Sequence, residues 1–356
     1  MRDGHRLASS QGNRLSRRTP WVTVVGRGVV EAFAPVRADL AGGTLDLWPL
    51  YCFHRDSLTV NVALRCGVRL RVIANGAPAG CIVHAVAGRR PRTLAASRAT
   101  TDLCAAVGFH FFPAGGVRVE VLDQPPVGSG LGGSSAFAVA LARACLCLTG
   151  GRVPGRPLVA VLRDLEATVL GAPTGVQDYY PALLGGALAI HLPPGGERVE
   201  RLGLRRGWLA RRLVVVYSGI THASGLVNWE VYRARVESDR RVAVSLDAVA
   251  SAARRCREAL LAGDEIGVGR AIAAEWRARR VLAPSVSPPE VDLLVRAGLA
   301  AGALAGKACG AGGGGSVLFW CPPRRRAGVA RAALSACARA ACLLGETAPP
   351  VRSVLS

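Results

Sequence analysis

The chain has 356 residues, a length with room for two domains that each bury a core. Half of the residues are apolar, yet no apolar run approaches the roughly 20 residues that a membrane helix needs, so we expect no membrane span. The formal net charge is +21, but all except one of the 45 basic residues are arginines, as a GC-rich coding bias would produce. With only 5% aromatic residues available for base stacking, we expect neither nucleic acid nor a membrane as a partner.

The cysteines and the N-terminus bear on the compartment. There are eleven cysteines, an odd number without any CxxC pair, so neither a disulfide framework nor a structural zinc site is indicated. Residues 1–27 are basic and lack the apolar stretch of a secretory signal, and we expect them to form a disordered leader. A cytoplasmic protein fits both observations.

Apolar patterning predicts a β-rich first half and a more helical second half. In the first half we predict strands at 29–35, 58–72 (a hairpin or two strands), 117–122 and 186–191, and helices at 134–148 and 158–170. A polar, irregular stretch at 193–207 precedes a strand at 213–217 and long helical patterns, which indicates a domain boundary. The second half ends with a helix at 289–304, a glycine tract at 310–315, a strand at 316–321 and a helix from 324. The expected domains are residues 28–205 and 206–345, followed by a tail at 346–356.

A glycine-rich turn directly before the predicted helix at 134–148 is typical of a phosphate-binding site. Residues 125–136 read Pro-Pro-Val-Gly-Ser-Gly-Leu-Gly-Gly-Ser-Ser-Ala. Positions without side chains let backbone N–H groups approach an anion, and the helix start supplies unpaired N–H groups and a favourable dipole. A flexible loop is the alternative, but such loops seldom run into a strongly apolar helix. The residues expected to contact phosphate are Gly128, Gly130, Leu131, Gly132, Gly133, Ser134, Ser135 and Ala136.

Two other nucleotide-binding motifs are excluded by their context. Gly128, Gly130 and Gly133 also satisfy the dinucleotide pattern G-x-G-x-x-G, but in that fold the glycines follow a strand almost at once and an acidic residue lies about 20 residues later. Here residues 123–126 intervene, and the next acidic residue after the glycines is Asp164. A Walker A loop is excluded because no Gly-Lys-Ser/Thr follows the glycines.

Three motifs, in order along the chain, carry a resemblance to a known family. They are Ala-Pro-Val-Arg-Ala-Asp-Leu-Ala-Gly-Gly-Thr-Leu-Asp at 34–46, the glycine-rich turn at 125–136, and Lys-Ala-Cys-Gly-Ala-Gly-Gly-Gly-Gly at 307–315. Together they resemble the GHMP kinase superfamily of galactokinases, homoserine kinases, mevalonate kinases and phosphomevalonate kinases, nearest to its heptose-7-phosphate and fucose-type sugar kinases. The resemblance implies an α+β fold with an N-terminal domain like ribosomal protein S5 domain 2 and a ferredoxin-like C-terminal domain. It also implies a monomer or homodimer that uses ATP and Mg²⁺ to phosphorylate a hydroxyl of a sugar or sugar phosphate.

The resemblance implies catalytic and metal-binding roles for individual residues. The loop at 171–180 is similar to the family segment that carries the catalytic aspartate, here Asp178, which would orient the acceptor hydroxyl and accept its proton. Arg37 stands where the first motif has its basic residue, and it would keep Asp178 ionised and stabilise charge on the transferring phosphoryl group. Glu166 and Ser135 match the Mg²⁺ ligands, although Ser134 and Ser135 can exchange roles, one facing the metal and one capping the helix.

The acceptor site follows from the same resemblance. Where related sugar kinases usually read Gly-Gly-Gly-Thr-Asp, this chain has Gly-Gly-Thr-Leu-Asp, so the register of its aspartate departs from the pattern. The galactokinase sequence Gly-Glu-His-Thr-Asp-Tyr is missing, which argues against galactose. The residues implied to bind the acceptor are Gly43, Thr44, Asp46, Gly175, Gly312 and Gly313.

Two further residues and several alternative functions stay open. Lys307 is expected near a helix end, facing solvent or touching phosphate, and His222 is a weaker candidate for acceptor contact. On the same fold, the alternatives are a mevalonate-pathway kinase, a homoserine kinase, an ATP-dependent decarboxylase and a non-catalytic ligand-sensing relative.

Overall fold

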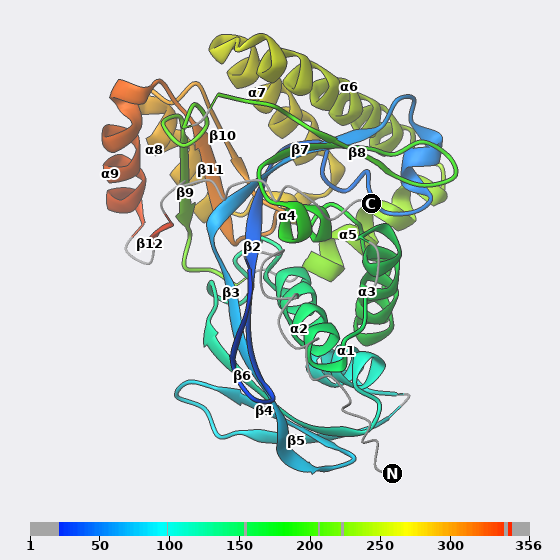
Figure 1. Ribbon diagram of the computed structural model, residues 1–356. Coiled ribbons are helices and arrows are strands. Elements are labelled where there is room, and N and C mark those ends of the chain that lie inside the picture. Colours follow the sequence, from blue (N-terminus) through cyan, green and yellow to red (C-terminus); the bar gives the residue numbers. More distant parts are fainter. Residues whose placement is uncertain are drawn as a thin grey trace, which may run out of the picture.

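The computed structural model describes residues 21–97, 99–152, 155–205, 207–221, 224–337 and 341–343, which form two β-sheets with helices packed around them (Figure 1). The first sheet has eight strands among these residues, in the order β1-β2-β3-β6-β4-β5, with β7 paired to β3 and β8 paired to β7. Its pairs are antiparallel, except that β4 runs parallel to β6. The strands are β1 (Val22–Gly26), β2 (Val29–Ala41), β3 (Leu58–Ala79), β4 (Cys81–Val86), β5 (Arg92–Ala95), β6 (Gly115–Asp123), β7 (Ala187–His191) and β8 (Arg198–Arg201).

The helices of the first half lie on one side of this sheet (Figure 1). Among them α2 (Gly133–Thr149) is buried all round from residue 135 to residue 145, because it is packed between β2 and β3 on one side and α1 and α3 on the other. This burial explains why its sequence is apolar on every face. The helices beside it are α1 (Leu103–Phe111), α3 (Gly155–Leu170) and α4 (Tyr179–Leu184).

The second sheet is antiparallel, in the order β10-β11-β9-β12. Its strands are β9 (Leu213–Tyr217), β10 (Ala305–Ala308), β11 (Ser316–Trp320) and β12 (Ala341–Leu343). The helices of this half are α5 (Ser224–Val236), α6 (Arg240–Ala262), α7 (Glu265–Leu282), α8 (Pro289–Ala300) and α9 (Arg326–Ala336). Three single turns complete the described elements: η1 (Leu50–Phe53), η2 (Pro284–Val286) and η3 (Pro323–Arg325).

The two halves pack directly against each other. The chain passes from the first sheet to the second between β8 and β9, the interval that contains the proposed domain boundary at residue 205. Nevertheless α6 and α7 contact β2 of the first sheet, and α6 also contacts β3. Within the described part of the chain, we find no helix with both the length and the hydropathy to cross a bilayer.

Several predicted elements need correction. The hairpin or pair of strands at 58–72 is in fact the single strand β3, and a Cβ on its Gly67 would lie 2.2 Å from the carbonyl oxygen of Ala34, so this glycine serves a close approach of β2 rather than a turn. The strand β1 lies inside the predicted leader, so the expectation of disorder is wrong for residues 22–26, while residues 1–20 lie outside the described residues. The helix predicted at 289–304 ends at residue 300, and β10 follows it. The elements α1, α4, β4, β5, β8, β10 and β12 were not predicted, and β8 lies in the stretch 193–207 that was expected to be irregular.

Candidate active site

The glycine-rich turn has the backbone of an anion-binding site. Gly128, Gly130 and Gly132 have φ values of 73°, 71° and 76°, in the left-handed region that glycine adopts without strain. Gly132 occupies the N-cap of α2, and no side chain caps this helix. The first N–H groups of α2, from Gly133 onward, are therefore available to a ligand such as a phosphate.

The second glycine tract, 310–315, packs against this turn. Ser316 donates its backbone N–H to the carbonyl of Ser129 at 2.8 Å. A Cβ on Gly310 would lie 2.9 Å from the carbonyl oxygen of Gly130, and one on Gly315 would lie 2.8 Å from that of Ser129. Glycine is required at both positions because the two backbones cross without room for a side chain. The tract therefore supports the glycine-rich turn from the second sheet.

Two predicted acceptor residues of this tract contact a different element. The N–H of Gly313 donates to the carbonyl of Val286 in η2 at 2.8 Å, and a Cβ on Gly312 would lie 2.6 Å from the same oxygen. Their role in acceptor binding stays a prediction, since their described contacts fix the tract to η2.

Arg37 and Asp178 meet beside the glycine-rich turn. Arg37, on β2, donates from Nε to Asp178 Oδ1 at 2.7 Å and from Nη1 to the carbonyl of Gly130 at 2.7 Å. The Arg37 side chain is buried, whereas that of Asp178 is 25% exposed, so one face of the carboxylate stays open. A Cβ on Gly132 would lie 3.0 Å from Asp178 Oδ2, which places the carboxylate directly against the turn.

The charge state of Arg37 is secured by its partners. Burial by itself lowers the pKa of Arg37, but the carboxylates of Asp178 and Asp39 outweigh it, so that the pKa lies above its ordinary value. The guanidinium is therefore a permanent positive charge at the mouth of the glycine-rich turn.

The predicted metal ligands also converge. Both Ser134 and Ser135 donate a hydroxyl hydrogen bond to the carboxylate of Glu166 on α3, Ser135 at 3.2 Å, and the Tyr179 hydroxyl donates to the same carboxylate. Neither serine caps α2, so the expectation that one of the two caps the helix is wrong. Burial raises the pKa of Glu166, and the hydrogen bonds from Ser134 and Tyr179 only partly offset it. A buried carboxylate flanked by hydroxyl oxygens is the donor set that Mg²⁺ prefers, so these residues fit the ion.

Residues 43–46, predicted to bind the acceptor and called the acceptor loop below, end at Asp46, against which Gly175 and Gln177 pack. This carboxylate is buried and its Oδ2 accepts the backbone N–H of Gln177 at 2.9 Å. A Cβ on Gly175 would lie 1.8 Å from Asp46 Oδ2, so only glycine fits there. Burial raises the pKa of Asp46 to about 6, with the N–H of Gln177 lowering it and the charge of Asp178 raising it further. Asp46 and Asp178 therefore belong to one electrostatic site.

Gly43 and Thr44 are held by a residue that the sequence did not reveal. Arg279 on α7 donates from Nη2 to the carbonyl of Gly43 at 2.9 Å and from Nη1 to Thr44 Oγ1 at 3.1 Å. Thr44 has a φ of 74°, an unfavourable conformation for a β-branched residue, and these bonds help to hold it.

Other predicted and unpredicted residues complete the site. The expectation that Lys307 faces solvent is wrong, because it is fully buried on β10 beside Asp39 and Glu275. Asp39, Glu275 and Tyr179 were not predicted. For Asp39, the two-residue spacing from Arg37 along β2 was an available signal, since alternate residues of a strand share a face. His222 lies outside the described residues.

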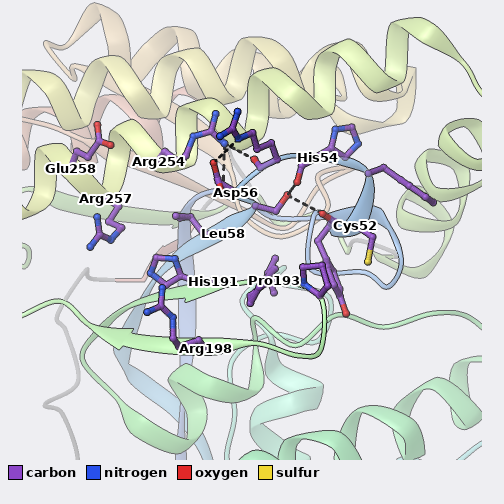
Figure 2. A pocket seen from close by; sticks show the side chains of 16 residues that line it. Cys52, His54, Asp56, Leu58, His191, Pro193, Arg198, Arg254, Arg257 and Glu258 are labelled. Atoms are coloured by element: carbon purple, nitrogen blue, oxygen red, sulfur yellow. Dashed lines mark hydrogen bonds and ion pairs between the residues drawn. The ribbon is translucent and has the colours of Figure 1, made fainter.

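A surface pocket of about 630 Å³ lies apart from these residues (Figure 2). It is lined by the segment 51–58, the turn between β7 and β8, and α6, and it contains none of the predicted site residues. Figure 2 shows Arg254 and Arg257 of α6 on one side and His191 and Arg198 on the other. The catalytic candidates thus lie in a separate region, around the glycine-rich turn.

Comparisons with known proteins identify the family. Residues 95–186 match the family model of the GHMP kinases N terminal domain, and residues 256–340 match that of the GHMP kinases C terminal domain. The chain belongs to the GHMP kinase superfamily, and the predicted α+β fold with its N- and C-terminal domains is confirmed.

The relatives have different acceptors. The chain is 26% identical over 213 residues to the D-glycero-alpha-D-manno-heptose 7-phosphate kinase of Campylobacter jejuni, covering 58% of this chain and 62% of that protein. It is 29% identical over 215 residues to the mevalonate kinase of Thermococcus gammatolerans, covering 59% and 61%. The chain therefore matches about three fifths of the length of these curated relatives.

Solved structures extend the likeness in fold to nearly the whole chain. A D-glycero-D-manno-heptose 1-phosphate kinase from Bacteroides thetaiotaomicron has a TM-score of 0.64 at 20% identity, covering 91% of this chain and 95% of that one. Galactokinase from Lactococcus lactis, complexed with galactose, has a TM-score of 0.72 at 15% identity, covering 90% and 93%. At these identities the likeness shows the fold.

Proposed function

We propose that this protein is an ATP-dependent kinase that transfers the γ-phosphoryl group to a hydroxyl of a sugar or sugar phosphate, with heptose-phosphate and fucose-type sugars as the first acceptors to test. The observation that carries the proposal is the ion pair of Arg37 with Asp178 against the glycine-rich turn, where Arg37 also bonds the carbonyl of Gly130. The ion pair supports the proposal because a carboxylate and a fixed positive charge lie together beside backbone N–H groups that are free to bind an anion.

Each part has a defined task in phosphoryl transfer. The N–H groups at the start of α2 bind the phosphates, and the open face of Asp178 orients the acceptor hydroxyl. Asp178 takes the hydroxyl proton as the new O–P bond forms, while the bond from the γ-phosphorus to the β–γ bridging oxygen breaks and ADP leaves. Arg37 is paired with Asp178 and lies where negative charge builds on the transferring group. Because the Arg37 guanidinium already bonds both Asp178 and the carbonyl of Gly130, its side chain needs little rearrangement during the reaction.

Ser135 and Glu166 would hold Mg²⁺, with Ser134 next to them. The ion supplies positive charge that offsets the charge of the nucleotide phosphates. Before a cation binds, Glu166 is kept in place by hydrogen bonds from both serines and Tyr179.

The acceptor loop favours a polyhydroxylated substrate. Asp46 and Asp178 supply two carboxylates that accept hydrogen bonds from sugar hydroxyls. The match to mevalonate kinases nevertheless makes mevalonate the second candidate acceptor. ADP release measured with hexoses, heptose phosphates, fucose, mevalonate and homoserine separates the two proposals, because only one class of acceptor should stimulate it strongly.

The catalytic assignment is tested by Asp178→Asn. We expect turnover to fall roughly a hundredfold or more, the usual range for a positioned base, while calorimetry shows unchanged nucleotide binding. Asp164→Asn is the matched control, because Asp164 is an exposed aspartate on α3 that pairs with its neighbour Arg163. Wild-type turnover in folded Asp178→Asn would refute the assignment.

A further inference from the structure

Lys307 is the single lysine among the 45 lysine and arginine residues of the chain, and all the others are arginines. It lies on β10, directly before the glycine tract, and its side chain is completely buried. With so strong a bias towards arginine, we expect arginine at every basic position where its side chain fits. The environment of Lys307 explains why lysine stands at this position.

The ammonium group of Lys307 lies between two buried carboxylates. Its Nζ is 2.8 Å from Asp39 Oδ2 and 3.2 Å from both oxygens of Glu275. A compact ammonium with three rotatable donors satisfies such a site, whereas a planar guanidinium with five fixed donors does not. Because all three side chains are fully buried, each charge depends on its partners for compensation.

This cluster contacts Arg37 and the glycine tract directly, and it contacts the acceptor loop through Arg279. Asp39 accepts the backbone N–H of Gly310 at 2.7 Å and lies 3.7 Å from Nη1 of Arg37. Glu275 accepts from Nε of Arg279 at 2.9 Å, and Arg279 in turn bonds the acceptor loop and the carbonyl of Gly310 at 3.2 Å. Lys307 therefore contacts the predicted catalytic arginine through one intervening residue, Asp39. It contacts the acceptor loop through two intervening residues, Glu275 and Arg279.

Lys307 is one of three cations that offset the carboxylates around Arg37. The connected groups comprise three cations, Arg37, Lys307 and Arg279, and three carboxylates, Asp39, Glu275 and Asp178. Without Lys307, Asp39 keeps the hydrogen bond from the Gly310 N–H but loses its nearest cation. It then competes with Asp178 for the guanidinium of Arg37, which both carboxylates already face.

We propose that Lys307 is a positioning residue for phosphoryl transfer: by neutralising Asp39 it leaves Arg37 directed at Asp178 and the glycine-rich turn. The inference rests on the proposed kinase function. It differs from a purely structural role because it locates the defect in the orientation of Arg37, and this defect is reversible by removing the competing charge on Asp39.

The test compares Lys307→Met with the double variant Lys307→Met/Asp39→Asn. Asparagine still accepts the Gly310 N–H through its amide oxygen but carries no charge. We expect kcat of folded Lys307→Met to fall roughly thirtyfold or more, since small misplacements cost up to about a hundredfold, with KM for ATP within about threefold of wild type. The double variant should recover about tenfold or more in kcat over Lys307→Met. Two independent structural losses would instead add.

Each outcome decides the proposal. The positioning role is overturned if folded Lys307→Met has a kcat near that of the wild type, or if the folded double variant is no faster than Lys307→Met. In either case, turnover by the wild-type protein still supports the kinase function. A wild-type protein without turnover on any acceptor overturns the kinase proposal and this inference with it. If Lys307→Met does not fold, Asp39→Asn and the double variant decide: their kcat values should agree within about threefold, and a larger gap refutes the idea. Arg277→Met, at an exposed position of α7, is the control.

Discussion

The raised pKa of Asp46 predicts that the ionised Asp46 carboxylate lowers the free energy of unfolding at neutral pH. Asp46→Asn removes the charge and keeps an oxygen that accepts the Gln177 N–H. The folded-state pKa of about 6 lies above the ordinary value of 3.8, so ionisation is less favourable in the folded protein. Each pKa unit corresponds to about 1.4 kcal/mol, which gives a difference of about 3 kcal/mol.

The sign and pH range follow from proton binding. Between pH 3.8 and about 6 the folded state binds more protons at Asp46 than the unfolded state, so this carboxyl's contribution is fully present below pH 3.8 and is lost as the pH rises through 6. Asparagine does not titrate. The free energy of unfolding of Asp46→Asn minus that of wild type should therefore increase by roughly 2 to 3 kcal/mol between pH 4 and pH 7.5.

Urea unfolding followed by tryptophan fluorescence at the two pH values measures this difference. The raised pKa of Glu166 is present in both proteins and cancels. Asp123→Asn, at an exposed position that ends β6, is the matched control and should change the unfolding free energy little at either pH. A difference between wild type and Asp46→Asn that is the same at pH 4 and pH 7.5 would show that Asp46 ionises without penalty, and the reasoning would fail.

Two further changes test the turn and the metal site. Gly132→Ala forces a left-handed φ of 76° on alanine and places its Cβ 3.0 Å from Asp178, so turnover should fall roughly tenfold or more. The control is Gly150→Ala, where φ is 69° and no atom lies within 4 Å of the added Cβ. It should lose similar stability in thermal unfolding but keep its turnover. Equal turnover in the two alanine variants would contradict the contact with Asp178. Glu166→Gln should raise the Mg²⁺ concentration for half-maximal turnover roughly tenfold or more in a titration at fixed ATP, and an unchanged midpoint would exclude Glu166 as a ligand.

The part of the site that sequence could predict is the part made by local backbone chemistry. Glycines before an apolar helix favour a turn that leaves backbone N–H groups free for an anion, so the left-handed backbone at Gly128 and Gly132 was predictable without tertiary information. Asp178, Arg37 and Glu166 needed the motifs of the family, and the structure brings all three to that turn or to the serines that follow it.

The buried charges could not be predicted, for a physical reason. A charged residue in a sequence reads as exposed, because burying it is unfavourable unless partners compensate it. Glu275 and Arg279 lie on α7 and their partners lie on β2, β10 and the acceptor loop, far away in sequence. Likewise the single strand β3 depends on the close approach of β2 at Gly67, which only the register of the two strands reveals.

These long-range contacts explain why motifs from both halves of the chain are needed for one site. The turn around Gly130 is bonded through Ser129 to Ser316 of the second sheet, and the strained Thr44 is bonded to Arg279 of α7. Neither backbone conformation is favourable by itself, since one exposes unpaired N–H groups and the other places a β-branched residue at positive φ. The second half of the chain supplies hydrogen bonds to both, in addition to the bond that Arg37 donates to the carbonyl of Gly130. The glycine-rich turn and the predicted acceptor loop both lie in the first half of the chain, and contacts from the second half help to position them relative to each other.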